Sequence, residues 1–217
     1  MGQAGLPSCG TIEPMTGQDT SAPVRLLQDA VRRLAVETRD RQRTGRTHDD
    51  ADDITGTALT DDAIGFDPLP LLRALDESGV RVVVIGQVAG IMHGSRELTG
   101  DLDLLWDGDA AYAGLMAAAF SAVSARLADE DGTPVPCDSG AFRLPKVLFH
   151  TAAASGDCCT PALPWGGLRV ADFLDRCDIA RADGFEIRYL NRQDLIAMRR
   201  AIGRVKDLRR AEELEAI

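Results

Sequence analysis

Two aspartates, Asp101 and Asp103, lie one residue apart inside an otherwise apolar strand pattern, GDLDLLWDG. In a β-strand, residues i and i+2 share a face, so both carboxylates point one way while Leu102 and Leu104 point into the core. Carboxylates roughly 7 Å apart along a strand repel each other and lose solvation unless a cation lies between them. Magnesium prefers carboxylate and phosphate oxygens, so the pair predicts a Mg²⁺ site that faces a nucleotide.

The segment before these acids predicts a phosphate-binding turn. The run RVVVIG is typical of a buried strand, and QVAGIMHG of a short helix that begins at Gly86 and ends at Gly94. The first N–H groups of a helix have no partner within it and carry a partial positive charge, which suits phosphate oxygens. We therefore expect a triphosphate at this turn and its metal ion on the next strand.

These features together resemble the DNA polymerase beta-like nucleotidyltransferase superfamily. The resemblance rests on the apolar strand, the Gly86-Gln87 pair, the short helix with the sequence HGSR at its end, the pattern TGDLD, and a C-terminal phrase, DLIAMRRAIGRVKDL, at residues 194–208. It covers about residues 68–217. In particular, the chain is similar to the minimal nucleotidyltransferases of bacterial abortive-infection and toxin–antitoxin systems.

The resemblance implies an enzyme that transfers a nucleoside monophosphate from an NTP to an acceptor hydroxyl with Mg²⁺. It makes Asp101 and Asp103 the metal ligands and catalytic acids, and Lys206 with Asp207 a site-facing pair on the last helix. The nucleotide-binding residues that it implies are Gly86, Gln87, Ser95, Arg96, Thr99, Lys206 and Asp207.

The chain departs from the family pattern at two points. Gln87 stands where the family prefers Gly or Ser, which adds bulk beside the phosphate. The family also has a third carboxylate on a later strand, but the corresponding stretch, KVLFHT at residues 146–151, contains no acid. A second Mg²⁺ ion would therefore lack a ligand, His150 becomes the candidate catalytic base, and Asp157 is expected to reach back only from a loop.

The chain divides into an N-terminal extension, residues 1–66, and a nucleotidyltransferase-like domain, residues 67–217. The extension comprises a disordered tail, an amphipathic helix at about residues 21–43 and an acidic linker, which we interpret as a flexible spacer. Strand and helix patterns in the domain predict an α/β (α+β) fold, a mixed sheet with helices on one side. The alanine-rich residues 110–132 predict one long helix.

Composition restricts the location and the partners of the protein. The 217 residues have a net charge of -10, no apolar run of membrane-spanning length and no signal-peptide pattern, which predicts a cytoplasmic protein without membrane contacts. Five irregularly spaced cysteines argue against a disulfide framework. Only two lysines, Lys146 and Lys206, are present.

The acceptor of the transferred group stays open between RNA, a protein hydroxyl and a small molecule. An acidic chain repels nucleic acid, but residues 181–210 contain nine basic residues against four acidic ones.

The predicted helix at residues 21–43 has two candidate roles. It packs on its own domain or on a second copy, or it binds a protein partner.

Two further readings compete with an active transferase. A catalytically weak or inactive fold would act as a nucleotide- or partner-binding protein of the toxin–antitoxin type. A dinucleotide-binding module would use the run VVVIGQVAG, but Val88 occupies the position of the middle glycine that such a motif requires.

Overall fold

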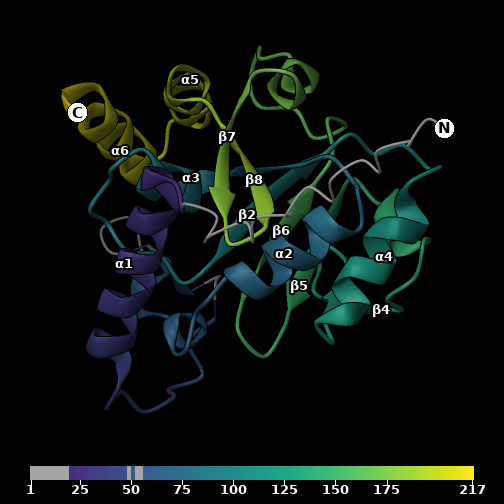
Figure 1. Cartoon of the computed structure of the whole chain (residues 1–217), viewed down its shortest axis with the longest axis horizontal. Helices are drawn as coiled ribbons and strands as arrows, with labels where there is room; N and C mark the ends of the chain where they lie inside the picture. The colour runs from purple at the N-terminus through teal and green to yellow at the C-terminus, as the bar shows by residue number, and fades with distance from the viewer. Residues whose placement is uncertain (1–19, 48–49, 52–55) are drawn as a thin grey trace, which may run out of the picture.

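The computed structural model describes residues 20–47, 50–51 and 56–217 and has a mixed α/β fold (Figure 1). Eight strands form one mixed sheet in the order β4-β3-β5-β6-β2-β1-β8-β7. The strands are β1 (Val82–Ile85), β2 (Leu102–Trp106), β3 (Arg126–Ala128), β4 (Pro134–Val135), β5 (Lys146–His150), β6 (Ser155–Cys159), β7 (Cys177–Ala182) and β8 (Phe185–Leu190). The predicted fold class is thereby confirmed.

Six α-helices among the described residues accompany the sheet, and in Figure 1 α2 and α4 lie in front of its strands. Their bounds are α1 (Ala22–Thr38), α2 (Leu69–Glu77), α3 (Gly86–Met92), α4 (Ala113–Ala122), α5 (Arg192–Ile202) and α6 (Val205–Ala216). None of the helices in the described part of the chain has the length and apolar character needed to cross a membrane.

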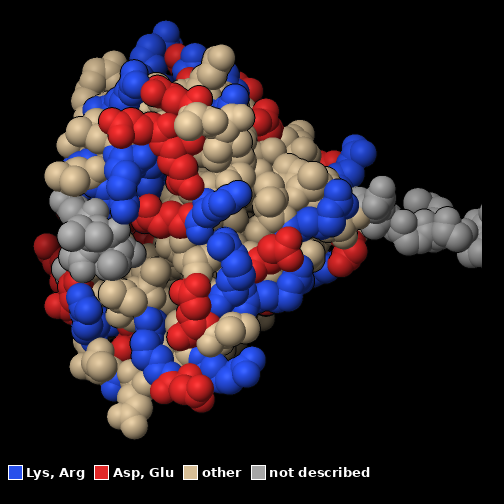
Figure 2. Space-filling view, turned by 90° about the vertical axis from the view of Figure 1, so that its left-hand side faces the viewer, with Lys and Arg blue, Asp and Glu red and all other residues tan. Residues whose placement is uncertain are grey.

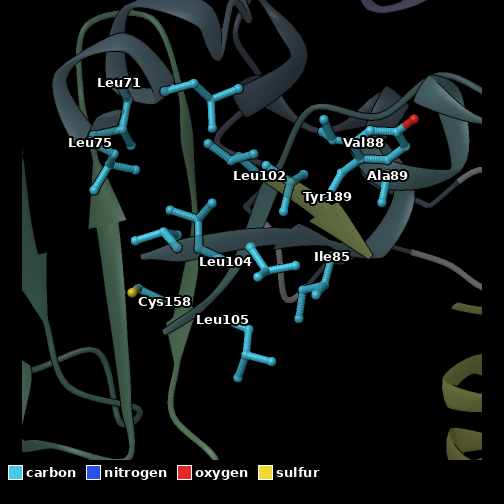
Figure 3. Close-up of a cluster of buried hydrophobic side chains, with 14 of the residues drawn as sticks. Leu71, Leu75, Ile85, Val88, Ala89, Leu102, Leu104, Leu105, Cys158 and Tyr189 are labelled. Carbon is cyan, nitrogen blue, oxygen red and sulfur yellow. The ribbon is translucent and has the colours of Figure 1, made fainter. Parts of the chain in front are cut away.

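The central strands β1 and β2 are almost wholly buried, which explains their continuous apolar sequences. Leu102 and Leu104 of β2 are fully buried, and they belong to the same core cluster as Leu71 and Leu75 of α2 (Figure 3). Strand β2 runs antiparallel to β1 and parallel to β6, while β8 runs parallel to β1. The ends of β1 and β8 therefore lie at the same edge of the sheet as the starts of β2 and β6.

The alanine-rich segment differs from the prediction of a single long helix. Helix α4 ends at Ala122, Ser124 adopts a left-handed φ of 55°, and the chain returns as β3. Strand β3 pairs antiparallel with β5, so tertiary pairing overrides the local helical pattern after residue 122.

Helix α1 packs against α3 and β7 and is part of the core of the molecule. Its buried residues include Val24, Leu27, Ala30 and Leu34, which belong to one hydrophobic cluster together with the sheet. The helix ends at Thr38, earlier than the predicted residue 43. Its apolar face is covered by its own domain, in agreement with the first of the two roles considered for it.

The segment after α1 also contributes to the core. Thr57, Thr60, Ala63 and Phe66 are buried, which differs from a flexible spacer up to residue 66. The tail at residues 1–19 and residues 48–49 and 52–55 of the acidic linker lie outside the described residues.

Leu27→Ala tests whether α1 belongs to the core. Leu27 is 1% exposed, so its truncation leaves a cavity, and we expect the free energy of unfolding to fall by about 2–5 kcal/mol. Its neighbour Leu26 is 41% exposed, and Leu26→Ala should cost no more than about 0.5 kcal/mol. Urea unfolding of both variants gives the comparison. Equal, small losses would show that residues 1–66 are a separate appendage.

Candidate functional site

A cavity of about 310 Å³ lies at the sheet edge where β1 ends and β2 begins. Its walls come from segments that are far apart in the sequence: the chain around residue 57, the first turn of α3, strands β2, β5 and β6, and helices α5 and α6. Six of the residues singled out from the sequence line it: Gly86, Gln87, Asp101, Asp103, Lys206 and Asp207.

Gly86 and Asp103 fit together as backbone and side chain. Ile85 pairs with Asp103 across the β1–β2 ladder, and Gly86 follows with a left-handed φ of 63°. A Cβ atom at Gly86 would overlap the Asp103 carboxylate. Glycine is therefore required at this position for two reasons: the left-handed backbone conformation, and the space that the Asp103 carboxylate occupies.

Asp101 lies just before β2, which begins at Leu102, so the acid precedes the strand and does not lie within it. Its side chain is held by two hydroxyls. Thr57 Oγ1 donates to Asp101 Oδ1 at 2.7 Å, and Thr99 Oγ1 donates to the same oxygen. The N-terminal extension thus reaches the site through Thr57, and Thr99 supports the acid from behind without lining the cavity.

Arg41 fixes the segment that presents Thr57. Its guanidinium donates to the carbonyl oxygens of Ala58, at 2.8 Å, and Thr60, at 2.6 Å. Thr57 Oγ1 also accepts a hydrogen bond from the Gly100 N–H at 3.0 Å, which ties the two segments together beside Asp101.

A third carboxylate is present, and the expectation that Asp157 could reach the site only from a loop is wrong. Asp157 lies in β6, which pairs parallel with β2 so that Asp103 and Asp157 are direct partners. Paired residues of neighbouring strands point to the same face, and Asp157 also lines the cavity. Gly156 permits the close approach of β6, since a Cβ atom there would overlap the backbone of Leu102.

Lys146 forms an ion pair with this carboxylate. Lys146 Nζ lies 2.7 Å from Asp157 Oδ2, and the two side chains are 27% and 15% exposed. Burial lowers the pKa of Lys146, but the charge and hydrogen bond of Asp157 outweigh it, so the net pKa is raised and the ammonium is retained. Burial, followed by the charges of Asp157 and Asp103, raises the pKa of the neighbouring Cys159 to about 12.

The bulk of Gln87 is accommodated by a buried hydrogen-bond network beside the turn at Gly86. Gln87 Oε1 accepts from Arg199 Nη2 at 2.7 Å, while Gln87 Nε2 donates to Ser95 Oγ at 3.0 Å and to the Glu97 carbonyl oxygen at 2.8 Å. Arg199 Nη2 also donates to the Gly86 carbonyl oxygen at 3.2 Å. Burial and the nearby Arg210 lower the pKa of Arg199 to about 10, which leaves it charged at neutral pH.

Ser95, Arg96 and His150 do not line the cavity. Ser95 Oγ donates to Glu213 Oε2 at 2.6 Å, and the Arg96 backbone N–H donates to Glu213 Oε1 at 2.9 Å, with the Arg96 side chain exposed. These contacts connect the end of α3 to α6, so the two residues do not have the nucleotide-contacting position expected of them. His150 is exposed at the end of β5, with Nδ1 3.8 Å from Asp62 Oδ1.

Lys206 and Asp207 differ in their partners. Asp207 pairs with Arg204, whose Nε lies 2.6 Å from Asp207 Oδ2. Lys206 is 9% exposed, lines the cavity, and has no hydrogen bond or salt bridge to another residue within the described part of the chain. A buried ammonium is costly without an anion, so Lys206 is the cavity group best suited to a phosphate.

The basic excess at residues 181–210 is partly neutralised in the folded chain by carboxylates from outside this segment. Arg209 and Arg210 pair with Glu97, at 2.8 Å and 2.5 Å, and Arg200 pairs with Glu215 at 2.6 Å. Figure 2 shows blue and red side chains intermingled on the face with α1 and α6. No continuous basic surface results there.

A second hollow of about 340 Å³ adjoins the first and shares Asp101, Lys146 and Asp157 with it. His150 lines this second hollow. The remaining charged residues in its lining are acidic, namely Asp62, Glu130 and Asp131. The three shared residues therefore lie where the two spaces meet, and these spaces could hold two reactants.

Asp101 and Asp103 are suited to one divalent ion. Across residues 20–47, 50–51 and 56–217, no three His, Cys, Asp or Glu side chains converge as a ready-made metal cage. Asp157 forms an ion pair with Lys146. Neither a protein-family model nor a curated protein matches this chain.

Gly86→Ala tests the fit between Gly86 and Asp103, with Gly79→Ala as the control. Both glycines have a left-handed φ, 63° and 73°, but only Gly79 has open space around its Cβ position. Gly79→Ala should cost about 1–2 kcal/mol of backbone strain and leave Mn²⁺ binding unchanged. Gly86→Ala should cost more and weaken Mn²⁺ binding at least about tenfold, since it displaces a ligand. Calorimetry on both variants measures this, and equal metal affinities would contradict the assignment.

Proposed function

We propose that the protein is a Mg²⁺-dependent nucleotidyltransferase of the DNA polymerase beta-like type. The observation that supports this proposal best is the cavity that joins Asp101 and Asp103, the glycine turn at Gly86 and the buried Lys206. A pair of adjacent carboxylates is suited to a cation, and a buried ammonium is suited to an anion. A Mg²⁺–triphosphate complex supplies both at once.

Each part of the nucleotide would contact a different group of residues that line this cavity. Asp101 and Asp103 would hold Mg²⁺, which neutralises phosphate charge when bound. Lys206 would contact the triphosphate, and the bare backbone of Gly86 would let it approach closely. Apolar side chains that also line the cavity offer a surface for the nucleobase: Leu163, Trp165, Met198 and Ile202.

The reaction follows from this placement. The oxygen of an acceptor hydroxyl bonds to the α-phosphorus, the hydroxyl proton passes to a carboxylate, and pyrophosphate leaves from the side of Lys206. Asp157, beside Asp103, takes the place of His150 as the group proposed to receive the proton. Its presence favours the active transferase over the inactive alternative.

The charges around the second hollow favour a neutral or cationic acceptor. Asp62, Glu130 and Asp131 would repel a phosphodiester chain, and Arg200 of α5 and Arg209 and Arg210 of α6 are already paired with carboxylates. A small polyhydroxy compound or a protein hydroxyl fits these charges better than RNA. Labelling of total protein, total RNA and small polyhydroxy amines with each α-³²P-NTP decides between the three.

Nucleotide binding is tested with the variants Asp101→Asn, Asp103→Asn and Lys206→Met. The two asparagine variants should abolish Mg²⁺-dependent NTP binding, because they remove the metal ligands. Lys206→Met should weaken NTP binding by about 10- to 100-fold through the loss of a charged hydrogen bond. Asp178→Asn, an exposed acid on β7, serves as the control and should bind NTP normally. Calorimetry with each of the four NTPs measures the affinities, and unchanged binding in the asparagine variants would refute the proposal.

A further inference from the structure

We propose that the ammonium of Lys146 takes the place of a second metal ion, so that the site works with a single Mg²⁺. This inference rests on the proposed function and concerns how the same site holds its charges. It assigns a role to a lysine that the family resemblance leaves without one.

The strand register places Lys146 against the third carboxylate. Lys146 pairs with Cys159 across the β5–β6 ladder, so Asp157 is its diagonal neighbour on the same face. The long lysine side chain spans this diagonal, and Nζ lies 2.7 Å from Asp157 Oδ2. Because Asp157 is also the direct partner of Asp103, the ammonium lies one strand away from the acid pair.

The charges around the site match a single dication. Asp101, Asp103 and Asp157 supply three negative charges at the starts of β2 and β6. One Mg²⁺ ion would balance the charges of Asp101 and Asp103, while the ammonium of Lys146 balances that of Asp157. A second dication would have to displace the ammonium from a half-buried ion pair, and separating such a pair is costly.

The position of Lys146 also suits a group that acts on the acceptor. Both hollows share Lys146, Asp101 and Asp157. An acceptor hydroxyl that enters from the second hollow would therefore pass the ammonium of Lys146 at the point where it reaches the α-phosphate. A cation at this point stabilises the negative charge that develops on the attacking oxygen. Lys206, the other lysine, lies on α6, in the first hollow only.

The number of bound Mn²⁺ ions tests this inference directly. With a non-hydrolysable NTP present, electron paramagnetic resonance should count one tightly bound Mn²⁺ in the unmodified protein. Lys146→Met releases Asp157 to act as a ligand, so the count should rise to two. Lys146→Arg keeps the cation and should stay at one, while the double variant Lys146→Met/Asp157→Asn should return to one.

The outcomes separate this inference from the proposed function. Two ions in the unmodified protein, or a count that stays at one in Lys146→Met with a native circular dichroism spectrum, would overturn the role of Lys146 while leaving a nucleotidyltransferase site in place. No NTP-dependent Mn²⁺ binding in the unmodified protein would overturn the proposed function itself. Asp178→Asn, the exposed acid on β7, is the control, and its count should stay at one.

Discussion

The pairing of β2 with two different neighbours is the constraint on which the site depends. Antiparallel β1 brings Ile85 opposite Asp103, and parallel β6 brings Asp157 opposite the same residue. A shift of either register by one residue would turn one carboxylate to the other face of the sheet. The burial of Leu102 and Leu104 in the core prevents such a shift, so the apolar side of β2 fixes the geometry of its polar side.

A second layer of contacts turns this geometry into a rigid cavity. Arg199, 2% exposed, donates to the carbonyl oxygen of Gly86 and to Gln87, so α5 holds the turn between β1 and α3. Glu213 holds the other end of α3 through Ser95 and Arg96. Gln87, Ser95 and Arg96, which the family resemblance assigned to the nucleotide, thus form hydrogen bonds that hold α3 and the turn at Gly86.

The sequence predicted what depends on local pattern, and it missed what depends on pairing between distant segments. The apolar run of β1 and the alternation in β2 predicted the centre of the sheet and one side of the site. Strand β6 has the sequence SGDCC, with no β-branched or aromatic residue, so nothing local marks Asp157 as a strand residue. The charge count over residues 181–210 did not include two carboxylates that pair with arginines of this segment. Glu97 is distant in the sequence, and Glu215 lies just beyond the segment.

The hydrogen bond from Thr57 to Asp101 has a practical consequence for dissecting this protein. A fragment that begins at residue 67 would contain all the acids of the site yet lack the hydroxyl that orients one of them, as well as α1, which covers part of the core. If such a fragment were inactive, the cause would be the loss of the Thr57 hydroxyl and of α1, and not the loss of a reactive group. Chimaeras and fusions should therefore be joined ahead of Ser21, the residue that precedes α1.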